Sequence, residues 1–372
     1  MKRTMQFLKQ NSMMTVAMIA ALVTVFFVPV DRTYLGYFDF KTLSCLFCVL
    51  AVVCALKDIN FFYMIARKIV EYFHTARLCV LALVYITFIG SMLIANDMAL
   101  LTFLPLGFYV LHTTHKEKYM AYVFILQNIA ANLGGMLTPF GNPQNLYLYT
   151  RFQIPNGEFL RIMFPPFCLA VILLTVCCLF VKGEPMILSS GKNQEEHHRR
   201  KTILYMALFA LSIAIVFRSI PYWVGLIVIP LVLFFADRHA LRMVDYPLLF
   251  TFVFFFIFAG NMARIPMVRD FFGLLLTKNT LLFSVVSCQF ISNVPSAILL
   301  SGFTENYADL LVGVNIGGVG TLISSLASLI TFREYIRHNP GRTLYYIGLF
   351  TLMNFGFLIL MLGFEFLYLS MI

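Results

Sequence analysis

The fold is decided by the stretch SNVPSAILLSGF at residues 292–303. It closes an apolar run over residues 271–304 that is interrupted at Asn293. About ten apolar-rich residues follow the interruption before Glu305, and ten helical residues rise only about 15 Å. The hydrocarbon core of a bilayer is about 30 Å thick. This segment therefore cannot cross a membrane, and we expect it to turn back as the second arm of a hairpin.

A second interrupted run covers residues 78–111 and is broken at Asn96-Asp97. The residues from Met98 to Leu111 would rise about 21 Å as a helix, which is also short of the hydrocarbon core. We expect a second re-entrant hairpin here; two tilted full spans are the alternative and give the same sidedness. Backbone at membrane depth is tolerated only where it is buried in protein or lines a wet cavity. Each hairpin tip is therefore expected to face a site.

The composition places the whole chain in a membrane. Of its 372 residues, 60% are hydrophobic and 12% are charged, and the mean hydropathy is +0.86. A soluble domain is about half apolar and a quarter charged. The expected fold class is an all-α polytopic membrane protein, with an amphipathic stretch at 57–77 and a polar linker at 182–201. The other expected spans cover 13–30, 40–56, 119–149, 162–181, 203–219, 222–236, 247–262, 307–332 and 344–369.

The positively charged residues lie in the predicted loops. The formal net charge is +10, but the basic residues lie in short segments between apolar runs, which argues against a nucleic-acid partner. If the N-terminus is cytoplasmic, the inside segments hold 19 of the 27 Lys and Arg residues. This is the positive-inside pattern. We expect a protein of the bacterial inner (cell) membrane with a cytoplasmic N-terminus, in which residues 13–30 form a retained first span rather than a cleaved signal.

An internal repeat relates the two halves. Residues 131–138 (ANLGGMLT) match residues 314–321 (VNIGGVGT), and both halves have the same order of span, span, amphipathic stretch, hairpin, broken span and span. The helix expected at 203–219 turns the second half upside down. The expected organisation is a first inverted repeat (1–181), a linker with a connecting helix (182–221) and a second inverted repeat (222–372). Inverted repeats with discontinuous helices are a design of secondary transporters.

Polar residues at the breaks are the candidate site. Asp97 is the sharpest, because an ionisable group at membrane depth is costly and is a functional candidate by default; a helix cap is the alternative. The glycine pairs at 134–135 and 317–318 let the backbone approach a ligand closely; close helix packing is the alternative explanation. Half-helix N-termini suit anionic groups, and Na⁺ as a coupling ion is expected near Asn96, Asp97, Asn293 and Asn315. The full candidate set is Asn96, Asp97, Asn132, Gly134, Gly135, Thr138, Asn142, Pro143, Asn145, Ser292, Asn293, Pro295, Asn315, Gly317, Gly318 and Thr321.

Other chemistry is disfavoured. The eight cysteines lie inside apolar runs and are expected to pack rather than bind metal, and the seven histidines fall in loops. No P-loop or HExxH motif occurs, and Asp97 stands alone without a paired aspartate. The chain is therefore not expected to be an enzyme or to hold a cofactor other than a coupling Na⁺. Glu365, near the end of the last span, is expected at the membrane interface.

At these breaks the sequence resembles the ion transporter superfamily, which includes citrate and dicarboxylate carriers, arsenite permeases and some sodium/proton antiporters. The resemblance rests on Asn96-Asp97, residues 138–145, residues 292–295 and residues 315–321. It implies a homodimer with a scaffold and a mobile transport domain, elevator-type access, and substrate and Na⁺ sites at the tips and unwound helices. The dicarboxylate carriers carry Ser-Asn-Thr at both tips, whereas Asp97 makes the first tip acidic, as in the arsenite and antiporter branches.

The expected function is a secondary active permease for a small anion, with citrate-type carboxylates as the lead substrate class and Na⁺ or H⁺ as the coupling ion. The alternatives are a Na⁺/H⁺ antiporter with Asp97 as the exchanging carboxylate, and an arsenite efflux permease. A channel of similar architecture differs from a carrier in that it cannot accumulate a substrate against a gradient.

Overall fold

The computed structural model describes residues 11–185 and 199–371, in which the regular elements are helices. Residues 1–10 and most of the expected polar linker lie outside the described residues. In the described ranges, seven helices are long and apolar enough to cross a membrane. This confirms the all-α polytopic fold, whereas the opposite membrane orientation of the two halves stays a prediction.

The first half begins with α2 (Ser12–Val25) and a 3₁₀ turn at Arg32–Tyr37. The predicted first span over 13–30 is too long, because the helix ends ahead of Pro29 and a residue before proline disfavours helical backbone. The later elements of this half are α3 (Phe40–Asp58), α4 (Phe61–Glu71), α5 (Ala76–Ile94), α6 (Asn96–Thr113), α7 (Met120–Gly134), α8 (Pro143–Arg151) and α9 (Asn156–Leu179).

The second half follows α10 (Arg199–Val216), α11 (Tyr222–Ala236) and the short α12 (Arg238–Met243). Its elements are α13 (Tyr246–Arg264), α14 (Pro266–Ile291), α15 (Asn293–Leu300), α16 (Tyr307–Ile316), α17 (Leu326–His338) and α18 (Thr343–Met371). Helix α14 is two helices, because the backbone at Asn279 is extended (φ −164°, ψ 94°). The order of elements from α3 to α9 therefore recurs from α13 to α18, with the first part of α14 in the place of α4.

The hairpins break where the sequence predicts. The helix break between α5 and α6 falls at Ala95, and that between α14 and α15 falls at Ser292. The length argument holds for α15, whose 8 residues rise about 12 Å. It is wrong for α6, which has 18 residues and rises about 27 Å, because Asn96 and Asp97 form its first turn and the helix continues through His112.

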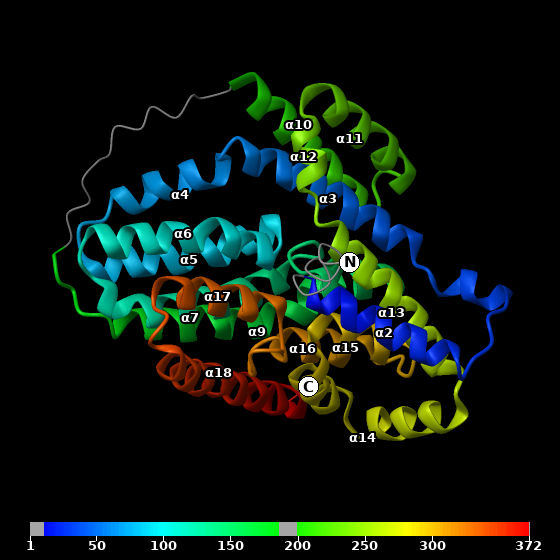
Figure 1. Cartoon of the computed structure of the whole chain (residues 1–372). Helices are drawn as coiled ribbons and strands as arrows, with labels where there is room; N and C mark the ends of the chain where they lie inside the picture. The colour runs from blue at the N-terminus through cyan, green and yellow to red at the C-terminus, as the bar shows by residue number, and fades with distance from the viewer. Residues whose placement is uncertain (1–10, 186–198, 372) are drawn as a thin grey trace.

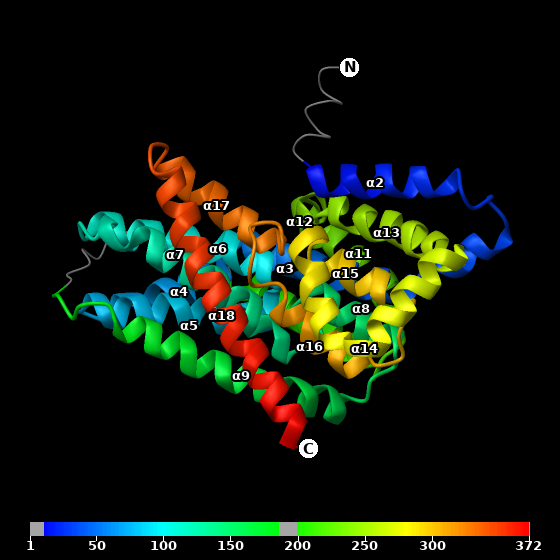
Figure 2. The ribbon, with the colours of Figure 1, turned by 90° about the horizontal axis from the view of Figure 1, so that it is seen from below.

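The helices form two groups by contact. One group contains α2, α3 and α10–α13, in which α2 lies along α13 and both α10 and α11 lie along α3 (Figure 1). The other contains α5–α9 and α14–α18, and Figure 2 shows it from a second direction. Within it, α6 packs on α17 and α15 packs on α8. The second arm of each hairpin therefore rests on the second part of the broken span from the other half.

Candidate functional site at the hairpin tips

Both hairpin tips have the same unusual backbone. Ala95 has φ 66° and ψ 150°, and Ser292 has φ 76° and ψ 160°. This region is almost restricted to glycine and costs about 1–3 kcal/mol for other residues. Each tip is held by its own half, since the backbone N–H of Asn96 donates to the Gly141 carbonyl at 3.1 Å. The backbone N–H of Asn293 likewise donates to a carbonyl in the loop between α16 and α17 at 2.9 Å. Such strain at two equivalent points marks both tips as specialised sites.

Two threonines tie the broken helices to the hairpins. The Thr138 hydroxyl donates to the Met92 carbonyl at 2.7 Å, and the Thr321 hydroxyl donates to the Gln289 carbonyl at 3.0 Å. Each acceptor stands three residues before its tip. The two predicted threonines therefore position the hairpins. A small cavity lies between the tips, and neither threonine lines it.

Side-chain amides join the two halves at the centre. The Asn96 amide donates to the side-chain oxygen of Asn132 at 3.3 Å. The Asn142 amide donates to the Asn132 carbonyl at 3.1 Å and to the side-chain oxygen of Asn315 at 3.0 Å. Asn315 in turn donates to the side-chain oxygen of Asn145 at 2.6 Å. Five asparagines of the predicted set thus form one buried network that crosses from the first half to the second.

The four predicted glycines divide into two roles. A Cβ on Gly134 would lie 2.3 Å from the carbonyl oxygen of Phe88, and one on Gly317 would lie 2.9 Å from a side chain of α14. These two glycines serve close helix packing. A Cβ on Gly135 would meet the side chain of the next loop at 2.3 Å, and one on Gly318 would lie 3.0 Å from the amide of the second tip asparagine. Gly318 therefore borders the site itself.

A small cavity lies between the tips, at the starts of four helices. Its lining comes from the first turns of α6, α8 and α15, the first residue of α17, and α2 and α13. The lining residues are Met13, Asn96, Asp97, Pro143, Gln144, Leu248, Thr251, Ser292, Asn293, Val294 and Leu326. Its volume is about 10 Å³, enough for one water molecule. Pro295 is buried in the first turn of α15 and does not line it.

Acceptor oxygens without partners gather at this cavity. Asp97 and Gln144 line the cavity, and their buried Oδ1 and Oε1 atoms have no hydrogen-bond partner among the described residues. The buried Oδ1 of Asn142, the residue before the lining Pro143, lacks one as well. A buried acceptor without a donor is costly, so such groups call for a ligand or a proton. Carboxylate and amide oxygens are the ligands that hard cations prefer. Gln144 is absent from the predicted set although it stands inside residues 138–145, because the prediction for this segment rests on its helix-breaking prolines and asparagines.

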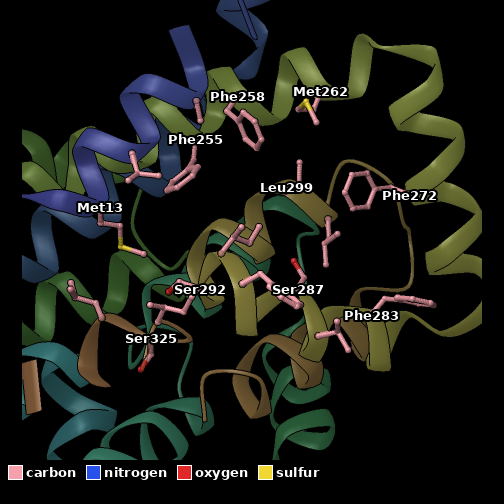
Figure 3. A pocket seen from close by; sticks show the side chains of 18 of the residues that line it. Met13, Phe255, Phe258, Met262, Phe272, Phe283, Ser287, Ser292, Leu299 and Ser325 are labelled. Carbon is pink, nitrogen blue, oxygen red and sulfur yellow. The ribbon is translucent and has the colours of Figure 1, made fainter. Parts of the chain in front are cut away.

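An apolar groove opens beside the second tip. It lies between α2, α13, α14 and α15, has a volume of about 600 Å³, and reaches the tip at Ser292. Figure 3 shows Phe255 and Phe258 of α13 on one side and Phe272 and Phe283 of α14 on another. The described residues of its lining are apolar apart from three serines, so this surface suits acyl chains rather than an ion.

A buried carboxyl lies away from the tips. Glu365 of α18 is only 4% exposed, its Oε1 has no hydrogen-bond partner, and it lines a cavity together with Asp309 and Arg161. The expectation of an interfacial position did not anticipate this burial, because it arises from packing of α18 against α9 and α16. No group of three or more metal-binding side chains occurs in the described part of the chain.

The comparisons with known proteins agree with this architecture. A family model described as "Citrate transporter" matches residues 7–309. The chain belongs to the citrate transporter family. It is 31% identical over 296 residues to an uncharacterized transporter of Methanocaldococcus jannaschii, covering 79% of this chain and 81% of that protein. It is also 28% identical over 315 residues to the inner membrane protein YbiR of Escherichia coli, covering 83% of each chain.

Membership confirms the resemblance drawn from the tips and the broken helices, and it makes the chain a multi-span membrane transporter. The match covers both hairpins, since it begins ahead of α2 and ends inside α16. The substrate and the coupling ion are separate questions, which the geometry of the tip cavity addresses.

Proposed function

We propose that the protein is a secondary active transporter that carries a small anion, with citrate or a related carboxylate as the lead substrate, coupled to Na⁺ or H⁺. The observation that carries this proposal is the meeting of four helix N-termini, those of α6, α8, α15 and α17, at one cavity. Each N-terminus acts as roughly half a positive charge. Among the residues that the structure describes, the lining of this cavity includes no Lys, Arg or His, and the helix ends offer the attraction for an anion.

The same cavity offers a place for the coupling cation. The unpartnered oxygens of the lining residues Asp97 and Gln144 provide a negative and a partly negative group next to the helix ends. A cation bound there offsets the charge of an anionic substrate, so each favours the binding of the other. Such mutual stabilisation is the thermodynamic basis of coupled transport.

The conformation is closed around the site, because a cavity of about 10 Å³ has no room for a tricarboxylate. Transport therefore requires the tips to move relative to the helices that cover them. An elevator-type movement of a homodimer in the bacterial inner membrane, with a cytoplasmic N-terminus, is the form that we propose; the bias of basic residues supports the orientation.

The test is uptake of labelled citrate and succinate into proteoliposomes under an inward Na⁺ gradient and, separately, a proton gradient. We expect accumulation that depends on one gradient, and its loss in Asp97→Asn. Asp309→Asn is the matched control, because it neutralises a carboxyl away from the tips. Uptake with unchanged ion dependence in Asp97→Asn would remove Asp97 from the coupling site.

Na⁺/H⁺ exchange is a second candidate, which the unpartnered Asp97 oxygen and the absence of a lining cation favour. Arsenite efflux is a variant of this candidate on the same fold. A pH-sensitive dye inside the vesicles distinguishes exchange from anion uptake: Na⁺-driven proton movement without any added anion supports the exchanger, and its absence together with citrate accumulation supports the carrier.

A further inference from the structure

A second polar cavity lies one helical turn from the tip cavity. It has a volume of about 600 Å³ and is lined by the 3₁₀ turn after α2, the start of α3, the ends of α8 and α13, and the end of α15. By the proposed orientation, all of these ends face the outside. We call this cavity the outer vestibule.

The vestibule and the tip cavity share α8, α13 and α15. The tip cavity touches Pro143 of α8 and Val294 of α15, and the vestibule touches Tyr147 and Ile298, four residues further along each helix. Four residues of α-helix rise about 6 Å. A solute in the vestibule is therefore only one helical turn from the tips.

A buried hydroxyl pair lines the vestibule. The Tyr147 and Ser301 hydroxyls are 2.8 Å apart, and both residues are 5% exposed. The Tyr147 ring also packs on Phe256 of α13, with 5.6 Å between ring centroids. These three side chains join α8, α15 and α13 in the wall of the vestibule.

The charges of the vestibule favour an anion. Lys41, Arg151, Arg264 and Asp39 line it. Arg264 is paired with Asp31 at 2.7 Å, and this guanidinium, with Thr33, lowers the pKa of Asp31 to about 2. Asp39 accepts two hydrogen bonds from Thr42 as the cap of α3, while neither Lys41 nor Arg151 forms an ion pair within the described residues.

We infer that the outer vestibule captures the anionic substrate, with Lys41 and Arg151 as the attracting groups. A small di- or tricarboxylate fits both the free cations and the volume of about 600 Å³. The inference rests on the proposed function for the direction of transport and the class of solute. The local excess of positive charge itself does not depend on it.

The test measures that charge without requiring transport. A cysteine is introduced at Gly302, where an added Cβ would meet only ordinary contacts, the nearest at 3.5 Å. Its modification by membrane-impermeant negatively and positively charged methanethiosulfonates is then timed in vesicles, with the chain lacking the new cysteine as the background. A cysteine at Ala263, another lining residue, repeats the measurement in case the first variant misfolds.

We expect the negative reagent to react faster relative to the positive one than it does with free cysteine. The double change Lys41→Gln and Arg151→Gln should lower that ratio by about fivefold at low salt, with a smaller effect at high salt. Arg161→Gln is the control, because Arg161 lines a different cavity. An unchanged ratio in the double variant overturns the inference, as does labelling from the inside only.

Uptake separates the two proposals. In the double variant we expect the KM for citrate to rise several-fold at low salt with little change in kcat. Charge-selective labelling without carboxylate uptake would overturn the proposed substrate and leave the anion vestibule standing. Carboxylate uptake with charge-indifferent labelling would overturn the vestibule and leave the transporter standing.

Discussion

Replacement of Asn315 by alanine is the sharpest test of the central amide network. Asn315 is 1% exposed and accepts hydrogen bonds from Asn142 at 3.0 Å and from Gln144 at 3.4 Å. It donates to Asn145 at 2.6 Å and to the Leu311 carbonyl in its own helix. After truncation, the Asn142 amide keeps its bond to the Asn132 carbonyl, but the Gln144 amide and the Asn145 oxygen lose the partners described here.

The expected cost follows from these two orphaned groups. A buried polar group left unsatisfied costs about 1–3 kcal/mol. Hydrogen bonds between membrane helices have measured contributions nearer 0.6 kcal/mol, with a maximum of about 1.7. We therefore expect Asn315→Ala to lower the free energy of unfolding by about 2–3 kcal/mol. In a chain of this size that corresponds to a fall of roughly 5 °C in the unfolding midpoint.

Asn354→Ala is the matched control. Asn354 is also buried, but its amide donates only to the Phe350 carbonyl of its own helix, and its Oδ1 already has no partner. Unfolding in detergent can be followed with a thiol-reactive dye, because six of the eight cysteines are buried. Equal losses for the two variants would refute the argument that the bonds between halves stabilise the core.

Two further predictions concern the tips and the orientation. Ala95→Gly should raise the unfolding midpoint or leave it unchanged, because glycine relieves the strained backbone. Ala99→Gly, four residues later within α6, should lower it; a clear loss in the first variant would contradict the strain. A cysteine introduced at Ala308, near the start of α16, should react only with reagents outside the vesicle, and labelling from inside would overturn the inverted orientation of the second half.

The sequence predicts the break points well because each break is encoded locally. Asn96 and Asn293 follow long apolar runs, and the Asn-x-Gly-Gly motifs combine a polar group with residues that disfavour a continuous helix. These are short-range signals, so the ends of α5, α7, α14 and α16 fall where the pattern places them. The end of the helix that follows a break is harder to predict from hydropathy. Helix α6 continues through the polar residue His112, because a helix in water does not have to stop where its apolar run ends.

What the sequence does not encode locally is which polar atom lacks a partner. Asn145 and Gln144 are neighbours in the chain, yet Asn145 donates to three loop carbonyls whereas Gln144 keeps an unpartnered oxygen at the cavity. Glu365 is similar, because its burial depends on α9 and α16. These distinctions arise from contacts between distant segments, so only the assembled fold separates a residue that holds the site from one that faces it.

The distribution of polar contacts indicates which parts of the molecule move together. Within the group that contains the hairpins, buried amide bonds such as Asn142–Asn315 join the two halves. Contacts from this group to α3, α10 and α13 include the aromatic pair Tyr147–Phe256 and a bond from Arg218 to a backbone carbonyl of α8. Separating the halves would leave several buried amides unpaired, which is expensive. Sliding the whole group past its neighbours mainly exchanges apolar contacts, so we expect it to cost less than separation of the two halves.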